Sequence, residues 1–275
     1  MGTLYVVATP IGNLEDVTLR ALRILREVGL VAAEDTRVAR KLLGRFGIAA
    51  RLISFNDHNK SIRIPEIIGR LAETDIALVS DAGTPAISDP GVELVAAVRE
   101  AGHAVVPIPG PSAVVAALSA AGLSARTFRF AGFLPREAGP LRRFFESLAI
   151  DTDTIVAFEA PARAVRTLRL LAEVLPERRV AVCRELTKLH EEVFVGSAHE
   201  AAEHFGDVRG EIVLIIEGAT AAPRREAGKD DEGLRGEVAQ MRELGLTRAQ
   251  AAALLERRFK VSRRRLYQLW LEAGT

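Results

Sequence analysis

Three short loops rich in Gly, Pro, Ser and Thr each follow an apolar run, and their residue types suit the binding of a small molecule. The longest is Ser80–Gly91, directly after Ile76–Val79. The other two are Thr9–Asn13 and Pro109–Ala113, each again preceded by an apolar segment. Such loops are stiff and expose backbone N–H groups. Open α/β sheets bind ligands at loops that leave the carboxyl ends of strands, so the three loops predict one shared pocket.

The same loops lack the patterns that hold phosphate-rich cofactors. No Gly-x-x-x-x-Gly-Lys-[Ser/Thr] sequence occurs, and Thr9–Asn13 contains one glycine where a dinucleotide fingerprint needs three. ATP and NAD are therefore disfavoured. S-adenosylmethionine, with its adenosine and its amino-acid end around a sulfonium, suits Ser, Thr and backbone amides. Methyl transfer from it requires alignment with a nucleophile and no bound metal.

Other common catalytic arrangements are missing from the sequence. The five histidines do not pair at metal-ligand spacing, so no metal site is expected. No Gly-x-Ser-x-Gly motif of serine hydrolases is present. Cys183 is the single cysteine and lies in an apolar segment, which predicts a buried, unreactive thiol and no intrachain disulfide.

Polar clusters after further apolar runs supply candidate catalytic groups. One cluster follows Leu30–Ala33, a second follows Leu52–Phe55, and a third, Arg184–Lys188, follows Val180–Cys183. As proton acceptor or orienting group we consider Glu34, Asp35, Asp57, His58 and Lys188. Each has a structural alternative. Asp35, for example, stands where the N-cap of a following helix is expected.

Apolar strands alternate with helical patterns to about residue 220, which predicts an α/β protein with sheets covered on both faces. A Gly/Ser-bearing link near residue 122 divides this part. We expect an N-terminal α/β domain over 1–122 that carries the cofactor loops, and a second α/β domain over 123–218. A linker over 219–236 and a basic helical appendage over 237–275 follow.

The appendage has a net positive charge, whereas the rest of the chain has a net negative charge. Residues 242–265 contain eight Lys or Arg and two Asp or Glu, a net charge of +6, which leaves the rest of the chain at −5. A capping box at Thr247–Gln250 and a possible cap at Ser262 predict two short helices that resemble a helix-turn-helix unit. This charge favours contact with a polyanion, although a solvated face on a packing appendage remains the alternative.

Composition is consistent with a globular protein outside the membrane. The 275 residues are 48% hydrophobic and 27% charged. No apolar run reaches the roughly 18 residues that span a bilayer. The chain begins without a basic, then apolar, leader segment, and we expect a cytoplasmic protein with no membrane partner.

Several of these segments together carry a resemblance. Leu4–Leu14, Ala33–Arg37, Ser80–Gly91, Pro109–Ala113 and Arg184–Lys188 closely resemble the bacterial small-subunit ribosomal RNA 2′-O-cytidine methyltransferases, which belong to the tetrapyrrole-methylase-like superfamily. The resemblance implies two α/β domains that enclose S-adenosylmethionine, usually in a homodimer. It also implies methylation of a ribose 2′-hydroxyl in the decoding region of 16S rRNA within the small ribosomal subunit.

Position by position, the resemblance and the loop pattern assign eleven residues to the cofactor. They are Pro10, Asp81, Gly83, Thr84, Ile87, Ser112, Ala113, Glu159, Ala160, Leu186 and Ala219. Basic residues near the loops and in the appendage are candidates for contacts with RNA phosphates. They are Arg37, Arg40, Lys41, Arg257, Arg258, Lys260, Arg263, Arg264 and Arg265.

Two other functions fit parts of this pattern. A tetrapyrrole C-methyltransferase would share the fold, but the basic appendage and the Thr9–Asn13 loop speak against it. A non-catalytic RNA-binding assembly factor would keep the fold without the cofactor, and the intact glycine-bearing loops speak against that.

Overall fold

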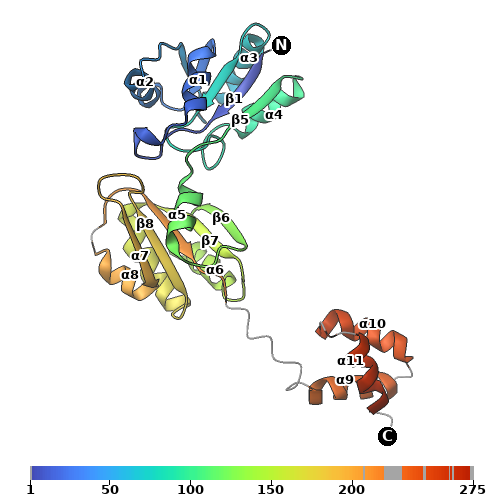
Figure 1. The fold of residues 1–275 in the computed structure, drawn as a ribbon. Helices are drawn as coiled ribbons and strands as arrows, with labels where there is room; N and C mark the ends of the chain where they lie inside the picture. The colour runs from blue at the N-terminus through green and yellow to red at the C-terminus, as the bar shows by residue number, and fades with distance from the viewer. Residues whose placement is uncertain are drawn as a thin grey trace. The chain divides into compact units, whose positions relative to one another are not determined.

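The computed structural model describes residues 2–206, 208–219, 231–243, 246–259, 261 and 263–272 (Figure 1). Within these ranges, the side chains of 231, 232, 243, 253, 254 and 256–259 are not described. The chain divides into two compact units, Met1–Ala219 and Thr220–Thr275. None of the described helices is both long and apolar enough to cross a membrane.

The first sheet of the larger unit is wholly parallel, with strand order β3-β2-β4-β1-β5. Its strands are β1 (Thr3–Val7), β2 (Leu30–Ala33), β3 (Leu52–Ser54), β4 (Ile76–Val79) and β5 (Ala104–Ile108). Every residue of β2 and β4 is buried, as expected for central strands with both faces covered. All five strands point the same way, so the loops that follow them meet at one edge. The apolar runs had predicted each of these strands.

Helices cover both faces of this sheet. One face packs against α1 (Leu19–Glu27) and α2 (Thr36–Arg45), and the other against α3 (Lys60–Leu71) and α4 (Val92–Glu100). A short 3₁₀ helix, η1 (Leu14–Asp16), follows the loop after β1. Helix α2 begins because the Asp35 side chain accepts a hydrogen bond from the Arg37 N–H, and α1 begins at a Thr18 cap of the same kind.

The second sheet is mixed, with strand order β6-β7-β10-β8-β9. It contains β6 (Phe128–Phe133), β7 (Thr154–Glu159), β8 (Arg179–Arg184), β9 (Glu192–Ser197) and β10 (Ile212–Ile216). Strand β10 runs antiparallel to both of its neighbours, β7 and β8. Strands β6 and β9 were not predicted. Both are edge strands and lie half in solvent, so their sequences show no continuous apolar run.

Helices also cover the second sheet on both faces. Helices α6 (Ala138–Ser147), α7 (Pro161–Val174) and α8 (Ala198–His204) share one core with it. Helix α5 (Ala113–Ala121) packs on the other face through Val114 and Ala117 (Figure 1). The predicted limit at residue 122 groups α5 with the first sheet, whereas α5 packs on the second. The domain limits themselves remain a prediction.

The smaller unit contains three helices in its described part, α9 (Asp231–Glu243), α10 (Arg248–Phe259) and α11 (Arg263–Glu272). The sequence predicted two. Residues 231–236, assigned to a linker, instead begin α9, and Leu234 and Val238 bury one face of it. Gly233 and Gly236 interrupt the helical pattern there, which hid the helix.

The predicted capping box at the start of α10 is confirmed. Thr247 Oγ1 accepts from the Gln250 N–H at 3.4 Å, and Gln250 Oε1 accepts from the Thr247 N–H at 2.9 Å. The proposed cap Ser262 lies outside the described residues.

Candidate functional site

A cavity of about 400 Å³ lies at the carboxyl edge of the first sheet. Its walls come from the loops after β1, β4 and β5 and from residues at one edge of the second sheet. The volume falls in the usual range for small-molecule sites. The expectation that the three glycine-bearing loops line one pocket is therefore confirmed.

Hydrogen bonds join the three loops to one another. The Thr9 N–H donates to the Gly83 carbonyl at 2.8 Å, and the Gly83 N–H donates back to the Thr9 carbonyl at 3.0 Å. The Thr84 hydroxyl donates to the Pro111 carbonyl at 3.4 Å. Gly83 adopts φ +78°, a conformation that other residues adopt with strain. The loop walls of the cavity are thus held in place before any ligand arrives.

Backbone strain gathers in two of the loops around the cavity. Among the described residues, four other than glycine have positive φ: Ala86, Ser88, Glu185 and Thr187. The first two follow β4 and the others follow β8. A β-branched residue such as Thr187 is costly there, and strain of this kind, about 1–3 kcal/mol a residue, concentrates at functional sites.

Eight of the eleven residues assigned to the cofactor line the cavity. They are Gly83, Thr84, Ile87, Ser112, Ala113, Glu159, Ala160 and Leu186. Pro10 and Asp81 do not line it, but each directly precedes a residue that does, Ile11 and Ala82.

Ala219 was assigned wrongly. Strand β10 is antiparallel to β7, so its first residue, Ile212, pairs with Glu159 beside the cavity. Its last residue, Ile216, pairs with Ile155 at the far end of β7. The Ala219 N–H accordingly donates to the Asp151 carbonyl at 2.6 Å, at the opposite edge of the sheet.

Other lining residues were missed. The chain that enters β10, Gly210–Val213, takes the place that Ala219 was expected to fill. Ser88 and Asp89 also line the cavity, and both lay within the long loop that the sequence had singled out. Phe133, at the end of β6, lines it too with 62% of its surface exposed, and its ring lies 5.5 Å from that of Phe158.

Glu159 is a buried carboxylate in this wall, with 1% of its side chain exposed. It accepts hydrogen bonds from the Ala160 N–H at 2.7 Å and the Thr167 hydroxyl at 2.6 Å, and it pairs with Arg163. Arg163 also donates to the Leu134 carbonyl at 3.3 Å. The carboxylate therefore ties β7 to α7 and to the segment after β6, which fixes this wall of the cavity.

Comparison with known proteins identifies the family. Residues 3–202 match the model of the tetrapyrrole (corrin/porphyrin) methylases. A Synechocystis protein named ribosomal RNA small subunit methyltransferase I is 48% identical over 99% of this chain and 98% of its own length. A Thermotoga maritima protein of the same name is 47% identical, over 79% of this chain and 99% of its own length.

The chain belongs to the ribosomal RNA small subunit methyltransferase I family, within the tetrapyrrole methylases.

Solved structures agree on the fold. A uroporphyrin-III-C-methyltransferase from Thermus thermophilus superposes with a TM-score of 0.56 at 24% identity, covering 79% of this chain and 94% of that one. A diphthine synthase superposes with a TM-score of 0.63 at 14% identity, covering 78% and 90%. At such identities the likeness concerns the fold alone. The predicted fold class, two α/β parts with a cavity at their loops, is confirmed.

None of the five candidate catalytic residues lines the cavity, and two of them, Glu34 and Asp35, form hydrogen bonds with Asp81 in the loop after β4. The Asp81 N–H donates to Glu34 at 3.3 Å, and the Asp35 N–H donates to Asp81 at 3.0 Å. Burial raises the pKa of Glu34, against a hydrogen bond from the Asp81 backbone. Hydrogen bonds from Arg37 lower the pKa of Asp35 to about 2, so Asp35 is a helix cap and a very weak base.

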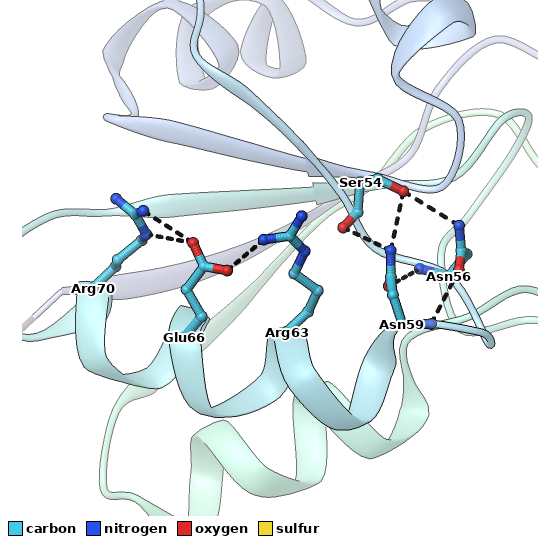
Figure 2. Close-up of polar contacts among 6 residues, drawn as sticks. All are labelled: Ser54, Asn56, Asn59, Arg63, Glu66 and Arg70. Carbon is cyan, nitrogen blue, oxygen red and sulfur yellow. Dashed lines mark hydrogen bonds and ion pairs between the residues drawn. The ribbon is translucent and has the colours of Figure 1, made fainter.

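Asp57 and His58 are exposed in the loop between β3 and α3. Figure 2 shows hydrogen bonds among Ser54, Asn56 and Asn59 around this loop. The Asn56 N–H donates to Asn59 Oδ1 at 2.9 Å, and Asn59 Nδ2 donates to the Ser54 carbonyl at 3.2 Å. Asp57 points into solvent and pairs with Lys60 at 3.0 Å. Further along α3, Figure 2 shows Glu66 bound on both sides by arginines. Neither Asp57 nor His58 is among the residues that line the cavity.

Lys188 is bound by two carboxylates. Its Nζ lies 2.9 Å from Glu185 Oε1 and 3.1 Å from Glu211 Oε2. Burial lowers the pKa of Lys188, but the hydrogen bonds to these carboxylates outweigh it, and the pKa is raised overall. Lys188 therefore stays protonated near neutral pH and cannot accept a proton. Its stem lies against the first loop, because a Cβ added to Gly12 would come within 2.5 Å of Lys188 Cγ.

The basic residues predicted to contact RNA lie on two units. Arg37, Arg40 and Lys41 are exposed on α2, and Arg37 pairs with Asp35. Arg263 and Arg264 are exposed at the start of α11. Arg265 donates to Gln268 at 3.3 Å and lies 4.0 Å from Glu272. Lys260 and the side chains of Arg257 and Arg258 lie outside the described residues.

Proposed function

We propose that this chain transfers the methyl group of S-adenosylmethionine to the ribose 2′-hydroxyl of a cytidine in the decoding region of 16S rRNA. The supporting observation is the cavity of about 400 Å³, walled by three joined loops, in a chain that shares 48% identity with a ribosomal RNA small subunit methyltransferase I over nearly its whole length. The same relatives favour this function over tetrapyrrole methylation and over a non-catalytic assembly role.

The cavity lining suits S-adenosylmethionine better than a phosphate-rich cofactor. Neither lysine nor arginine is among the described residues that line it, whereas three carboxylates are: Asp89, Glu159 and Glu211. Apolar side chains such as Ile11 and Leu186 suit an adenosine, and the carboxylates disfavour the phosphates of ATP or NAD. When bound, this cofactor supplies an electrophilic methyl group. The residues that would hold it are the eight assigned ones that line the cavity.

The chain's own part in this reaction is mainly alignment. Loops that are joined by hydrogen bonds and strained before binding hold a nucleophile and an electrophile in line without further ordering, which supplies much of the acceleration in transfers of this kind. Arg37, Arg40 and Lys41 on α2 are proposed to contact RNA phosphates, together with the basic residues of the C-terminal helices.

We infer further that the substrate is the small ribosomal subunit and that the enzyme acts as a homodimer in the cytoplasm, where that subunit is found. Light scattering on the purified chain tests the dimer. Mapping of ribose methylation in 16S rRNA from cells with and without this protein tests the function. We expect loss of one 2′-O-methylcytidine in the decoding region, and an unchanged methylation map would contradict the proposal.

The first prediction concerns Gly83. Substitution Gly83→Val is expected to weaken binding of S-adenosylmethionine at least about tenfold, because φ +78° strains a β-branched residue by about 1–3 kcal/mol and disturbs the bonds to Thr9. The added Cβ itself has room, since the nearest atom to it is Ile11 Cγ2 at 3.5 Å. Calorimetry measures the affinity.

Gly47 provides a matched control for that variant. It has a similar φ of +62°, has no atom within 4 Å of an added Cβ and lies after α2, away from the cavity lining. Gly47→Val should cost similar stability and leave cofactor affinity unchanged. Equal losses of affinity in both variants would show that Gly83 acts only through general stability.

A second prediction concerns metals. Among the described residues, no three His, Cys, Asp or Glu side chains form a group that would hold a metal ion. We therefore expect EDTA to leave the melting temperature and the affinity for S-adenosylmethionine unchanged. Turnover is not the readout, because the RNA has its own magnesium requirement. A drop in either quantity that added metal restores would contradict the prediction.

A further inference from the structure

Four titratable side chains line the cavity in the described part of the chain: Asp89, Glu159, Cys183 and Glu211. Three of them are already engaged. Glu159 is bound by Arg163 and Thr167, and Glu211 is bound by Lys188 at 3.1 Å. Cys183 is fully buried, and burial raises the pKa of its thiol to about 11.

Asp89 differs from Glu159 and Glu211 because no ion pair to it is found among the described residues, and it differs from Cys183 because it is only half-buried. It lies half-buried in the loop after β4, within the strained stretch that contains Ala86 and Ser88. Gly91 ends the loop at φ +146°, and an added Cβ there would come within 3.0 Å of Leu78 and 3.2 Å of Ala86. The backbone on both sides of Asp89 is therefore fixed, and its carboxylate is presented to the cavity with no cation from the described residues to neutralise it.

We infer that Asp89 is the residue that accepts the proton of the ribose 2′-hydroxyl, an assignment that rests on the proposed function. The ribose oxygen forms a bond to the methyl carbon while the carbon–sulfur bond breaks and leaves its electron pair on sulfur. The hydroxyl proton passes to a carboxylate oxygen of Asp89. The products are a 2′-O-methyl ribose, a neutral thioether and a protonated Asp89, which then returns its proton to water.

The surroundings of Asp89 favour this role. Burial raises the pKa of Asp89, a hydrogen bond with Ser80 opposes that rise, and the charge of Asp81 adds to it. Glu34 also interacts with Asp89, since the negative charge of Asp89 helps to raise the pKa of Glu34. A carboxylate among such neighbours is a stronger base than a free aspartate, and general bases of this kind contribute about 10²- to 10⁴-fold in rate.

The test uses the full chain, labelled S-adenosylmethionine and small ribosomal subunits from cells that lack this protein. Asp89→Asn keeps the shape of the side chain and removes the base. We expect kcat to fall by at least about 100-fold while the Kd for S-adenosylmethionine changes by less than about twofold. Glu100→Gln, an exposed carboxylate at the last residue of α4, is the matched control and should retain full activity.

The pH profile separates a base from a structural group. In the wild type, kcat should fall as the pH drops through the raised pKa of Asp89, because the protonated carboxyl accepts no proton. Asp89→Glu should keep this fall in kcat at low pH, with its midpoint at a different pH. In Asp89→Asn the fall should be absent, and the rate should instead rise with hydroxide concentration.

The possible results have distinct meanings. An active wild type with an equally active Asp89→Asn variant overturns the assignment of Asp89 alone. A variant whose affinity for S-adenosylmethionine falls tenfold or more overturns it too, because the carboxylate then serves the cofactor. A wild type that methylates no subunits overturns the proposed function, and this inference with it.

Discussion

Replacement of Arg163 by alanine is expected to lower the free energy of unfolding by about 3–5 kcal/mol. The variant would leave the carboxylate of Glu159 buried, with 1% of its side chain exposed and no cation beside it. The hydrogen bonds from Ala160 and Thr167 remain, but they do not neutralise the charge. Urea titration followed by far-ultraviolet circular dichroism measures the change. The cavity wall built on Glu159 should loosen, so cofactor affinity should fall as well.

Two further variants test the cause of that loss. Arg166 lies one turn along α7, is exposed and donates only to the Arg136 carbonyl at 2.7 Å among the bonds found, so Arg166→Ala should cost less than about 1 kcal/mol. The double variant Glu159→Gln with Arg163→Met removes both charges and should recover most of the stability. Arg163 Nη1 is buried without a hydrogen-bond partner, which already makes the pair costly. A single Arg163→Ala variant as stable as Arg166→Ala would contradict this account.

The first sheet was predictable because its strands are buried on both faces. Runs such as Leu30–Ala33 and Ile76–Val79 are continuous in apolar residues and are separated by amphipathic helices. The second sheet was less predictable from the sequence. Its edge strands β6 and β9 alternate without a clear apolar run, and the apolar run Ile212–Ile216 carries no sign of its direction. Because the sequence does not show that this strand is antiparallel, Ala219 was expected near the cavity and instead lies at the opposite end of the strands.

The residue types at the site could be predicted, whereas their roles could not. Polar residues after strands were correctly expected near one edge of the first sheet. Which of them is free to react depends on partners that only the fold supplies. Lys188 forms ion pairs with Glu185 and Glu211, and the Asp35 side chain caps the start of α2. Asp89 was not among the candidate proton acceptors, because its neighbours in the sequence do not show whether a Lys or Arg pairs with it in the fold.

Deletion of residues 220–275 is expected to leave the affinity for S-adenosylmethionine within about twofold of the wild type. Every described residue that lines the cavity belongs to Met1–Ala219, which forms a compact unit with its own cores. The Thermotoga maritima relative, matched over 99% of its length, corresponds to only 79% of this chain, so the family includes shorter members. Calorimetry and thermal melting of the truncated chain check the expectation.

The same truncation should weaken binding to small ribosomal subunits and make its salt dependence shallower. Removal of each phosphate contact should reduce the slope of log affinity against log salt by about 0.7–0.9. The smaller unit has its own core of Leu234, Leu255 and Leu266, so the exposed Arg264 at the start of α11 is not needed for packing and can face a polyanion. In the full chain, Arg264→Ala should reduce the slope of log affinity against log salt by about 0.7–0.9, the contribution of one phosphate contact, without a change in melting temperature. If truncation and Arg264→Ala both leave affinity and slope unaltered, the C-terminal helices do not dock on RNA, and their positive charge only keeps an exposed surface solvated.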